Sequence, residues 1–181
     1  ISSLVDRGLQ RSDVGDFRAA CAVRAAMMAA QPLWPNSKSK GRQMTIQTVG
    51  VIGAGTMGNG IAQTCAVAGL NVVMVDISEA AVQKGLATVA SSLDRLIKKE
   101  KISEADKTAA LSRIKASTSY DDLKAAQLVI EAATENYDLK VKILKQVDEL
   151  LAPEVLLASN TSSISITQLG ATTKRADKFI G

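Results

Sequence analysis

Three glycines carry the first spacing in this sequence that could do chemistry. Gly53, Gly55 and Gly58 form a G-x-G-x-x-G pattern between the β-branched run 48–52 and a helix-forming stretch. In such a turn the first glycine allows a tight bend, the second lets backbone approach a pyrophosphate, and the third lets the helix pack on its strand. The N–H groups and positive dipole end of the helix beginning near Thr56 then face phosphates. The pattern predicts a dinucleotide-binding loop.

Asp76 supplies the acid that this pattern requires further along the chain. It ends the apolar run 71–76 (NVVMVD), eighteen residues after Gly58. A carboxylate there accepts both hydroxyls of an adenine ribose and repels a 2′-phosphate, and the next residues, Ile77 and Ser78, bring no arginine. NAD is therefore favoured over NADP. The alternative is that Asp76 caps the following helix.

Two later stretches place polar residues directly after apolar runs: 127–140 (QLVIEAATENYDLK) and 157–167 (LASNTSSISIT). Open α/β sheets bind ligands at the carboxyl ends of their strands, so both stretches are candidate ligand loops. The polar run 159–163 could instead cap the helix that follows or satisfy turn backbone.

The elements that must position these residues alternate from Thr45 onward, which predicts an α/β fold of Rossmann type with a doubly wound, mostly parallel sheet. Strands are expected at 48–52, 72–76, 128–131, 155–159 and from 179, and helices at 57–68, 79–100, 104–114 and 138–151. Apolar residues recur at three- and four-residue steps in the long helix 79–100, and Ser103 predicts the cap of the next one.

The helices 79–100 and 104–114 are longer than a crossover between strands requires. The first would span about 30 Å, so the pair is expected to project beyond the sheet. The charged residues 98–101 would lie near its tip. They are interpreted either as a solvated turn or as a cationic clamp for a phosphate-bearing ligand.

Bulk composition excludes several function classes. The net charge of +4 resides in residues 1–43, which hold seven Lys/Arg against three Asp/Glu, whereas residues 44–181 hold fifteen of each. No nucleic-acid face follows from that balance. No apolar run approaches the roughly 20 residues that span a membrane. Cys21 and Cys65 show no metal-ligand spacing, and Cys65 is expected to be a small buried residue.

Residues 1–43 differ in composition from the rest and are interpreted as a leader and linker outside the fold. Arginines and small residues resemble a mitochondrial transit peptide, but Asp6, Asp13 and Asp16 do not fit one. We therefore expect Met44 to be the natural start of a cytoplasmic bacterial protein. A mitochondrial matrix location is the alternative if the leader is a genuine transit peptide.

Taken together, the motifs GAGTMGNGIAQ, VVMVD, EAATEN and ASNTSSISIT resemble the 3-hydroxyacyl-CoA dehydrogenase family, and within it the bacterial 3-hydroxybutyryl-CoA dehydrogenases. The resemblance covers residues 45–181. It implies NAD contacts from Gly53, Ala54, Gly55, Thr56, Met57, Gly58, Asp76, Glu135, Lys140 and Ser162. It also implies coenzyme A contacts from Ser92 and Lys99, and makes Ser162 the active-site serine that contacts both cofactor and substrate. Read structurally, Glu135 could instead begin a helix cap and Lys140 could lie on a solvated face.

The resemblance further implies oxidation of an L-3-hydroxyacyl-CoA, such as 3-hydroxybutyryl-CoA, to the 3-ketoacyl-CoA. The family's catalytic base is a histidine, oriented by a glutamate, and this sequence contains no histidine. The histidine-bearing segment and the all-helical dimerising domain of the family are not found here, so the 181 residues are expected to bind NAD without turnover. Two alternatives remain open: a stand-alone, non-catalytic nucleotide-binding module, and a dehydrogenase of a free 3-hydroxy acid.

Overall fold

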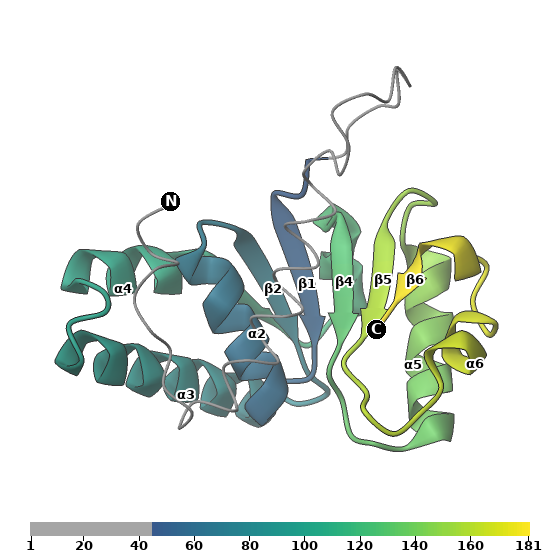
Figure 1. Cartoon of the computed structure of the whole chain (residues 1–181), viewed down its shortest axis with the longest axis horizontal. Coiled ribbons are helices and arrows are strands. Elements are labelled where there is room, and N and C mark those ends of the chain that lie inside the picture. Colours follow the sequence, from purple (N-terminus) through teal and green to yellow (C-terminus); the bar gives the residue numbers. More distant parts are fainter. Residues whose placement is uncertain (1–44) are drawn as a thin grey trace.

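The computed structural model describes residues 45–181, which form one six-stranded sheet with helices on both faces (Figure 1). Every strand pair is parallel, in the order β3-β2-β1-β4-β5-β6. The strands are β1 (Thr48–Ile52), β2 (Asn71–Val75), β3 (Ile114–Ser117), β4 (Leu128–Glu131), β5 (Leu156–Ser159) and β6 (Phe179–Ile180). The chain order reverses direction between β1 and β4, which is the ligand-binding crevice of a doubly wound sheet. The Rossmann-type fold predicted from the sequence is confirmed.

Alternating side chains of the strands build two separate cores. Val72 and Met74 pack beneath α2 (Thr56–Val67), α3 (Glu79–Lys98) and α4 (Glu104–Ser112). Val73 and Val75 face the opposite side, towards α5 (Tyr137–Leu150), α6 (Ile166–Gly170) and the 3₁₀ turn η2 (Tyr120–Ala125). A short 3₁₀ turn, η3 (Ala176–Lys178), leads into β6. Because both faces are covered, the strands are nearly uninterrupted apolar runs.

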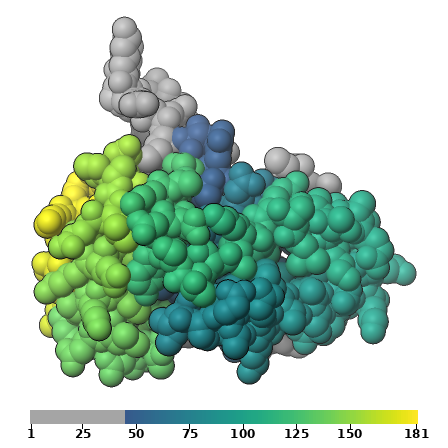
Figure 2. All heavy atoms as spheres, turned by 180° about the vertical axis from the view of Figure 1, so that it is seen from behind, coloured from purple at the N-terminus to yellow at the C-terminus, as the bar shows by residue number. Residues whose placement is uncertain are grey.

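The helices α3 and α4 extend well past the β3 edge of the sheet, as their length predicted (Figure 1). In the space-filling view from behind, their teal residues form a lobe at the side of the molecule (Figure 2). The apolar face of α3 is buried at Val82, Val89 and Leu93, and an ion pair between Lys107 and Asp94 joins the two helices. Ser103 begins α4 in a capping box with Asp106, as expected.

The structure adds four elements to the expected list. The predicted helix 104–114 ends at Ser112, and Ile114–Ser117 is the edge strand β3, paired with β2. This strand has four residues and no clear alternation, so periodicity could not detect it. The short elements η2, α6 and η3 were also absent from the expected list. The expectations for residues 1–43 and for Met44 lie outside the described residues.

Two further observations concern residues 45–181 alone. Cys65 is 2% exposed, and burial raises the pKa of its thiol to about 12, in agreement with the expected buried role. No helix in this part of the chain is both long enough and apolar enough to cross a membrane.

Candidate nucleotide site

The fold itself requires two of the three glycines. Gly53 has a φ of +105°, which L side chains rarely adopt, and its N–H donates to the Val75 carbonyl at 2.7 Å. A Cβ on Gly53 would lie 2.7 Å from the Ala132 carbonyl oxygen. A Cβ on Gly58 would lie 1.7 Å from the Gly53 carbonyl oxygen, so α2 could not keep its place. Both glycines are explained by packing within the chain.

Gly55 is different, because nothing in the chain requires a glycine there. Its φ of −76° and ψ of −172° are extended backbone open to any residue, and a Cβ at this position would have no atom within 4 Å. It is exposed and stands at the N-cap of α2, where no side chain caps the helix and no acidic residue occupies the first turn. The dipole and N–H groups of such a helix end attract an anion. The bare glycine leaves the space that an approaching pyrophosphate would use.

Asp76 lies against this loop at the end of β2. One carboxylate oxygen (Oδ2) accepts the Ala54 N–H at 2.6 Å, and the other (Oδ1) accepts the Ile77 N–H at 2.7 Å. The helix that follows is capped by Ser78, whose hydroxyl accepts the Ala81 N–H. The alternative that Asp76 is merely a helix cap is therefore wrong.

A groove of about 440 Å³ opens between Asp76 and the first turns of α5. The glycine loop and the β4–α5 loop both line it, together with Ile77, which is 88% exposed. Residues from η2 and α5 that sequence reasoning missed complete the walls: Tyr120, Leu139, Lys142, Ile143 and Gln146. They could not be found from motif spacing, because only the packing of α5 against η2 brings them to Asp76.

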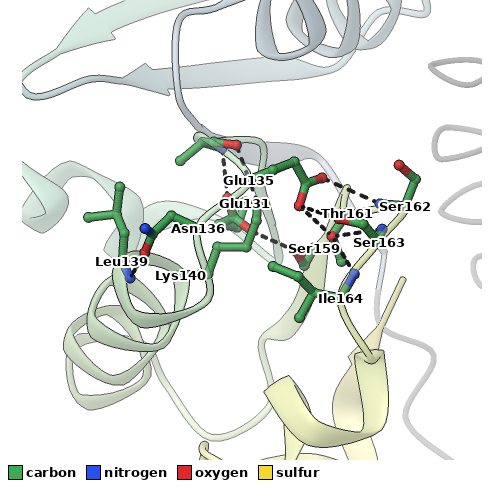
Figure 3. Close-up of polar contacts among 11 residues, drawn as sticks. Glu131, Glu135, Asn136, Leu139, Lys140, Ser159, Thr161, Ser162, Ser163 and Ile164 are labelled. Carbon is green, nitrogen blue, oxygen red and sulfur yellow. Dashed lines mark hydrogen bonds and ion pairs between the residues drawn. The ribbon is translucent and has the colours of Figure 1, made fainter.

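Glu135 and the β5–α6 loop meet at the same edge of the sheet (Figure 3). The Glu135 carboxylate accepts the Thr161 hydroxyl at 2.7 Å, the Ser163 hydroxyl at 3.3 Å and the Ser162 N–H at 3.4 Å. The Thr161 hydrogen bond, followed by the positive charge of Lys140, holds the pKa of Glu135 below its ordinary value. Asn136 is the actual N-cap of α5, so the alternative that Glu135 begins the cap is wrong.

Ser162 is exposed, and its hydroxyl points away from Glu135 (Figure 3). The structure thus brings Glu135 and Ser162 together from segments 27 residues apart while leaving the Ser162 hydroxyl accessible. Thr161 also accepts the Ile164 N–H at 3.2 Å, so part of the run 159–163 does satisfy turn backbone. The cap of α6 is Ser165, outside that run.

Lys140 occupies an unexpected place. Its side chain is 0% exposed, so the alternative of a solvated face is wrong. The ammonium donates to both carboxylate oxygens of Glu131, at 2.8 and 2.9 Å, and to the Ala133 carbonyl at 3.3 Å. A direct contact between this ammonium and a bound cofactor would require the ion pair to open.

Ser92 and Lys99, implied as coenzyme A contacts, lie two turns apart on the outer half of α3. Ser92 is half-buried and Lys99 is exposed at the C-cap of the helix. Because α3 runs away from the sheet, the structure does not bring these two residues to the glycine loop (Figure 1).

Comparisons with known proteins decide the family. Residues 48–181 match the model of the 3-hydroxyacyl-CoA dehydrogenase, NAD binding domain. The chain belongs to the 3-hydroxyacyl-CoA dehydrogenase family. The matched region is that family's NAD-binding domain, so NAD is its cofactor, as the sequence predicted.

Individual relatives agree with this assignment. The chain is 49% identical over 136 residues to a 3-hydroxybutyryl-CoA dehydrogenase of Bradyrhizobium diazoefficiens, covering 75% of this chain and 46% of that protein. It is 44% identical over 131 residues to a 3-hydroxybutyryl-CoA dehydrogenase of Clostridioides difficile, covering 72% and 47%. The chain thus spans about half the length of these curated relatives.

A solved structure is closer in sequence. The (S)-3-hydroxybutyryl-CoA dehydrogenase of Ralstonia eutropha is 77% identical with a TM-score of 0.73, covering 75% of this chain and 48% of that one.

Proposed function

We propose that this chain holds NAD(H) with the loop Gly53 to Gly58, Asp76, Glu135 and Ser162, as the cofactor domain of an enzyme that oxidises an L-3-hydroxyacyl-CoA. The observation that carries the residue assignment is Gly55. Gly53 and Gly58 would be glycines in this fold with or without a ligand, but Gly55 has a permissive backbone and open space around it. A group arriving from outside gives this open position a reason to be glycine.

The position of Asp76 supports the assignment of the adenosine end. Its carboxylate is fixed beside the loop by the Ala54 N–H, within the groove, where it can accept ribose hydroxyls. A negative charge at this place repels a 2′-phosphate. The lining of the groove holds no arginine that could bind such a phosphate, and its one cation, Lys142, comes from α5 and not from the segment beside Asp76. Preference for NAD over NADP follows.

The sheet order supports the assignment of the other end. β2 lies on one side of β1, and β4 and β5 lie on the other. A dinucleotide whose adenosine ribose meets Asp76 at β2 therefore places its second half over the loops that carry Glu135 and Ser162. The nicotinamide supplies the hydride-accepting chemistry when bound. The exposed Ser162 hydroxyl is suited to hydrogen-bond an oxygen of cofactor or substrate.

A 3-hydroxyacyl-CoA substrate is proposed from the names of the relatives, with 3-hydroxybutyryl-CoA as the specific case. Lys99, exposed at the end of the projecting helix, would attract a phosphate of coenzyme A, and Ser92, two turns earlier on the same helix, would contact another part of that molecule. The hydroxyl proton must go to a base with a pKa near neutrality, and the 181 residues contain no histidine. We propose that this base, its orienting carboxylate and a dimer interface come from the remainder of a protein about twice as long.

The decisive experiment replaces Gly55 by valine and titrates the purified chain with NADH, following nicotinamide fluorescence. The free energy of unfolding should fall by no more than about 1 kcal/mol, because a Cβ at position 55 meets no atom within 4 Å and valine is only a poorer N-cap than glycine. NADH affinity should fall by at least about tenfold, because the side chain occupies the approach of the pyrophosphate. Gly58→Ala is the contrasting variant. Its Cβ would clash with the Gly53 carbonyl oxygen, so its free energy of unfolding should fall even without NADH. Unchanged NADH affinity in a folded Gly55→Val chain would refute the proposal.

A further inference from the structure

Glu131 ties together three segments that are separate in the sequence. It is the last residue of β4, it is fully buried, and its register partner is Ser159, the last residue of β5. Its carboxylate accepts the Ser159 hydroxyl at 2.5 Å and the Ala133 N–H at 2.7 Å, as well as the Lys140 ammonium. Its carbonyl accepts the Asn160 N–H at 2.8 Å. A carboxylate has about four acceptor positions, and all of them are used here.

The segments held by Glu131 are those that carry the proposed ligand groups. Ala133 belongs to the β4–α5 loop, which lines the groove and continues to Glu135 two residues later. Ser159 begins the β5–α6 loop, which continues to Ser162 three residues later. The exposed contacts between Glu135 and Thr161 span the same two loops in front of the buried cluster (Figure 3). The buried bonds and the exposed ones therefore join the same two loops.

Stability of α5 does not explain this cluster. Lys140 is the fourth residue of the helix, and a cation near a helix N-terminus opposes the helix dipole. A buried ion pair is also often no more stable than apolar side chains of similar size in the same place. What the cluster provides, and apolar side chains could not, is directed hydrogen bonds to Ala133 and Ser159.

We propose that Glu131 is a positioning residue which, with Lys140 and Ser159, sets the two loops so that Glu135 and Ser162 meet the nicotinamide riboside half of NAD(H). This proposal rests on the function proposed above. Lys140 then acts from behind the loop, through Glu131 and the Ala133 carbonyl, and by its charge on Glu135. The adenosine half is held by Asp76 and the glycine loop. None of Glu131, Lys140 and Ser159 lines that groove, and the cluster meets it at Ala133, so ADP binding should depend on the cluster less than NADH binding does.

The test is a comparison of two ligands in two double variants of the full 181-residue chain. Glu131→Leu/Lys140→Met replaces the cluster's ion pair by apolar side chains. Asp148→Leu/Arg175→Met does the same to the buried ion pair at the opposite end of α5, which has no part in the groove. Binding of NADH is followed by fluorescence, and binding of ADP by calorimetry. ADP carries the adenosine and pyrophosphate but lacks the nicotinamide riboside.

In the Glu131→Leu/Lys140→Met variant, NADH affinity should fall about tenfold, the worth of one charge-assisted hydrogen bond, while ADP affinity changes less than about twofold. The control double variant should keep both affinities. If the first variant does not fold, Ser159→Ala tests the same idea more gently, with roughly a threefold loss for NADH and none for ADP.

Two results would overturn the proposal: equal losses for NADH and ADP, which would mean a general structural role, and unchanged affinity for both. Failure of the wild-type chain to bind either ligand would instead refute the proposed function itself, and the role of Glu131 would fall with it.

Discussion

The two ends of helix α5 each carry a buried ion pair, and the two pairs are built for different tasks. At the N-terminal end, Lys140 and Glu131 share their bonds with the loops at the carboxyl edge of the sheet. At the C-terminal end, Arg175 donates to the Asp148 carboxylate at 2.5 Å and to four backbone carbonyls. Those carbonyls belong to Asp148, Leu151, Ala152 and Val155.

The difference lies in what each cation satisfies. The last carbonyls of a helix have no partner within it, and the fork of a guanidinium can serve several of them at once. Arg175 therefore stabilises the C-terminal end of α5 and holds the segment before β6 against it. The helix dipole also favours a cation at this end. Lys140 sits against that dipole and holds loops that face a ligand. One pair maintains the fold, and the other sets the shape of a site.

Removing the cation from each pair should give the largest losses of folding stability. Lys140→Met and Arg175→Met each leave a buried carboxylate without its ionic partner, so each should lower the free energy of unfolding by about 3–5 kcal/mol. Urea denaturation measures this. Lys145→Met, an exposed lysine on the same helix, is the matched control and should change stability by less than about 0.5 kcal/mol.

Repeating those denaturations with NADH separates the two ends of the helix. A ligand at one hundred times its dissociation constant adds about 2.7 kcal/mol to the stability of a protein that binds it. Arg175→Met should gain this full increment at the NADH concentration that saturates wild type. Lys140→Met should gain less, because its site is weakened. Equal gains in the two variants would show that the two pairs do not differ in function.

A smaller effect is expected from the hydroxyl groups that support each pair. Ser159→Ala removes a buried hydrogen bond to a charged carboxylate and should cost about 1.5–3 kcal/mol. Thr173→Ala removes a neutral bond to the Gly170 carbonyl and the long bond, 3.4 Å, that the hydroxyl accepts from the Arg175 N–H, and should cost about 0.5–1.5 kcal/mol. Thermal and urea unfolding measure both. A Thr173 variant that is the less stable of the two would contradict the ranking.

Sequence reasoning placed residues correctly in the fold where the relevant spacing lies within one structural unit. Gly53, Gly58 and Asp76 belong to a single β-α-β unit, so their separation along the chain fixes their separation in space. The same holds for Ser103, whose capping partner is three residues away. The strand at Ile114–Ser117 escaped, because a four-residue edge strand carries too little pattern.

Groups whose role depends on tertiary burial could not be predicted in this way. Lys140 stands among polar residues at the start of a helix, which favours a solvated position, and only the packing of α5 on β4 and β5 buries it beside Glu131. Arg175 lies in a polar stretch with no motif, 27 residues from Asp148. In both cases a long side chain crosses between elements that the sequence does not show to be neighbours.

The smallest expected effect concerns the charge of Glu135 and not stability. The Thr161 hydrogen bond and the charge of Lys140 both hold the pKa of Glu135 below its ordinary value. Thr161→Val should raise that pKa in a carbon-detected NMR titration. The variant's stability should fall by no more than about 1 kcal/mol, because Glu135 is exposed and the substitution otherwise removes the turn bond from the Ile164 N–H.

The sign of the pH dependence follows from the direction of that shift. A carboxylate with a lowered pKa in the folded chain contributes stability above its unfolded pKa and loses the contribution as pH falls through the folded value. In Thr161→Val the contribution should be smaller, and its loss should be complete at a higher pH. Lys140→Met should also raise the pKa of Glu135, since it removes a nearby positive charge. Arg175→Met should leave the pKa of Glu135 at the wild-type value, because Arg175 is not among the charges that act on Glu135. Equal shifts of the Glu135 pKa in the two variants would contradict this comparison. They would mean that the charge of Lys140 acts on the site no more strongly than the charge of Arg175 at the other end of α5.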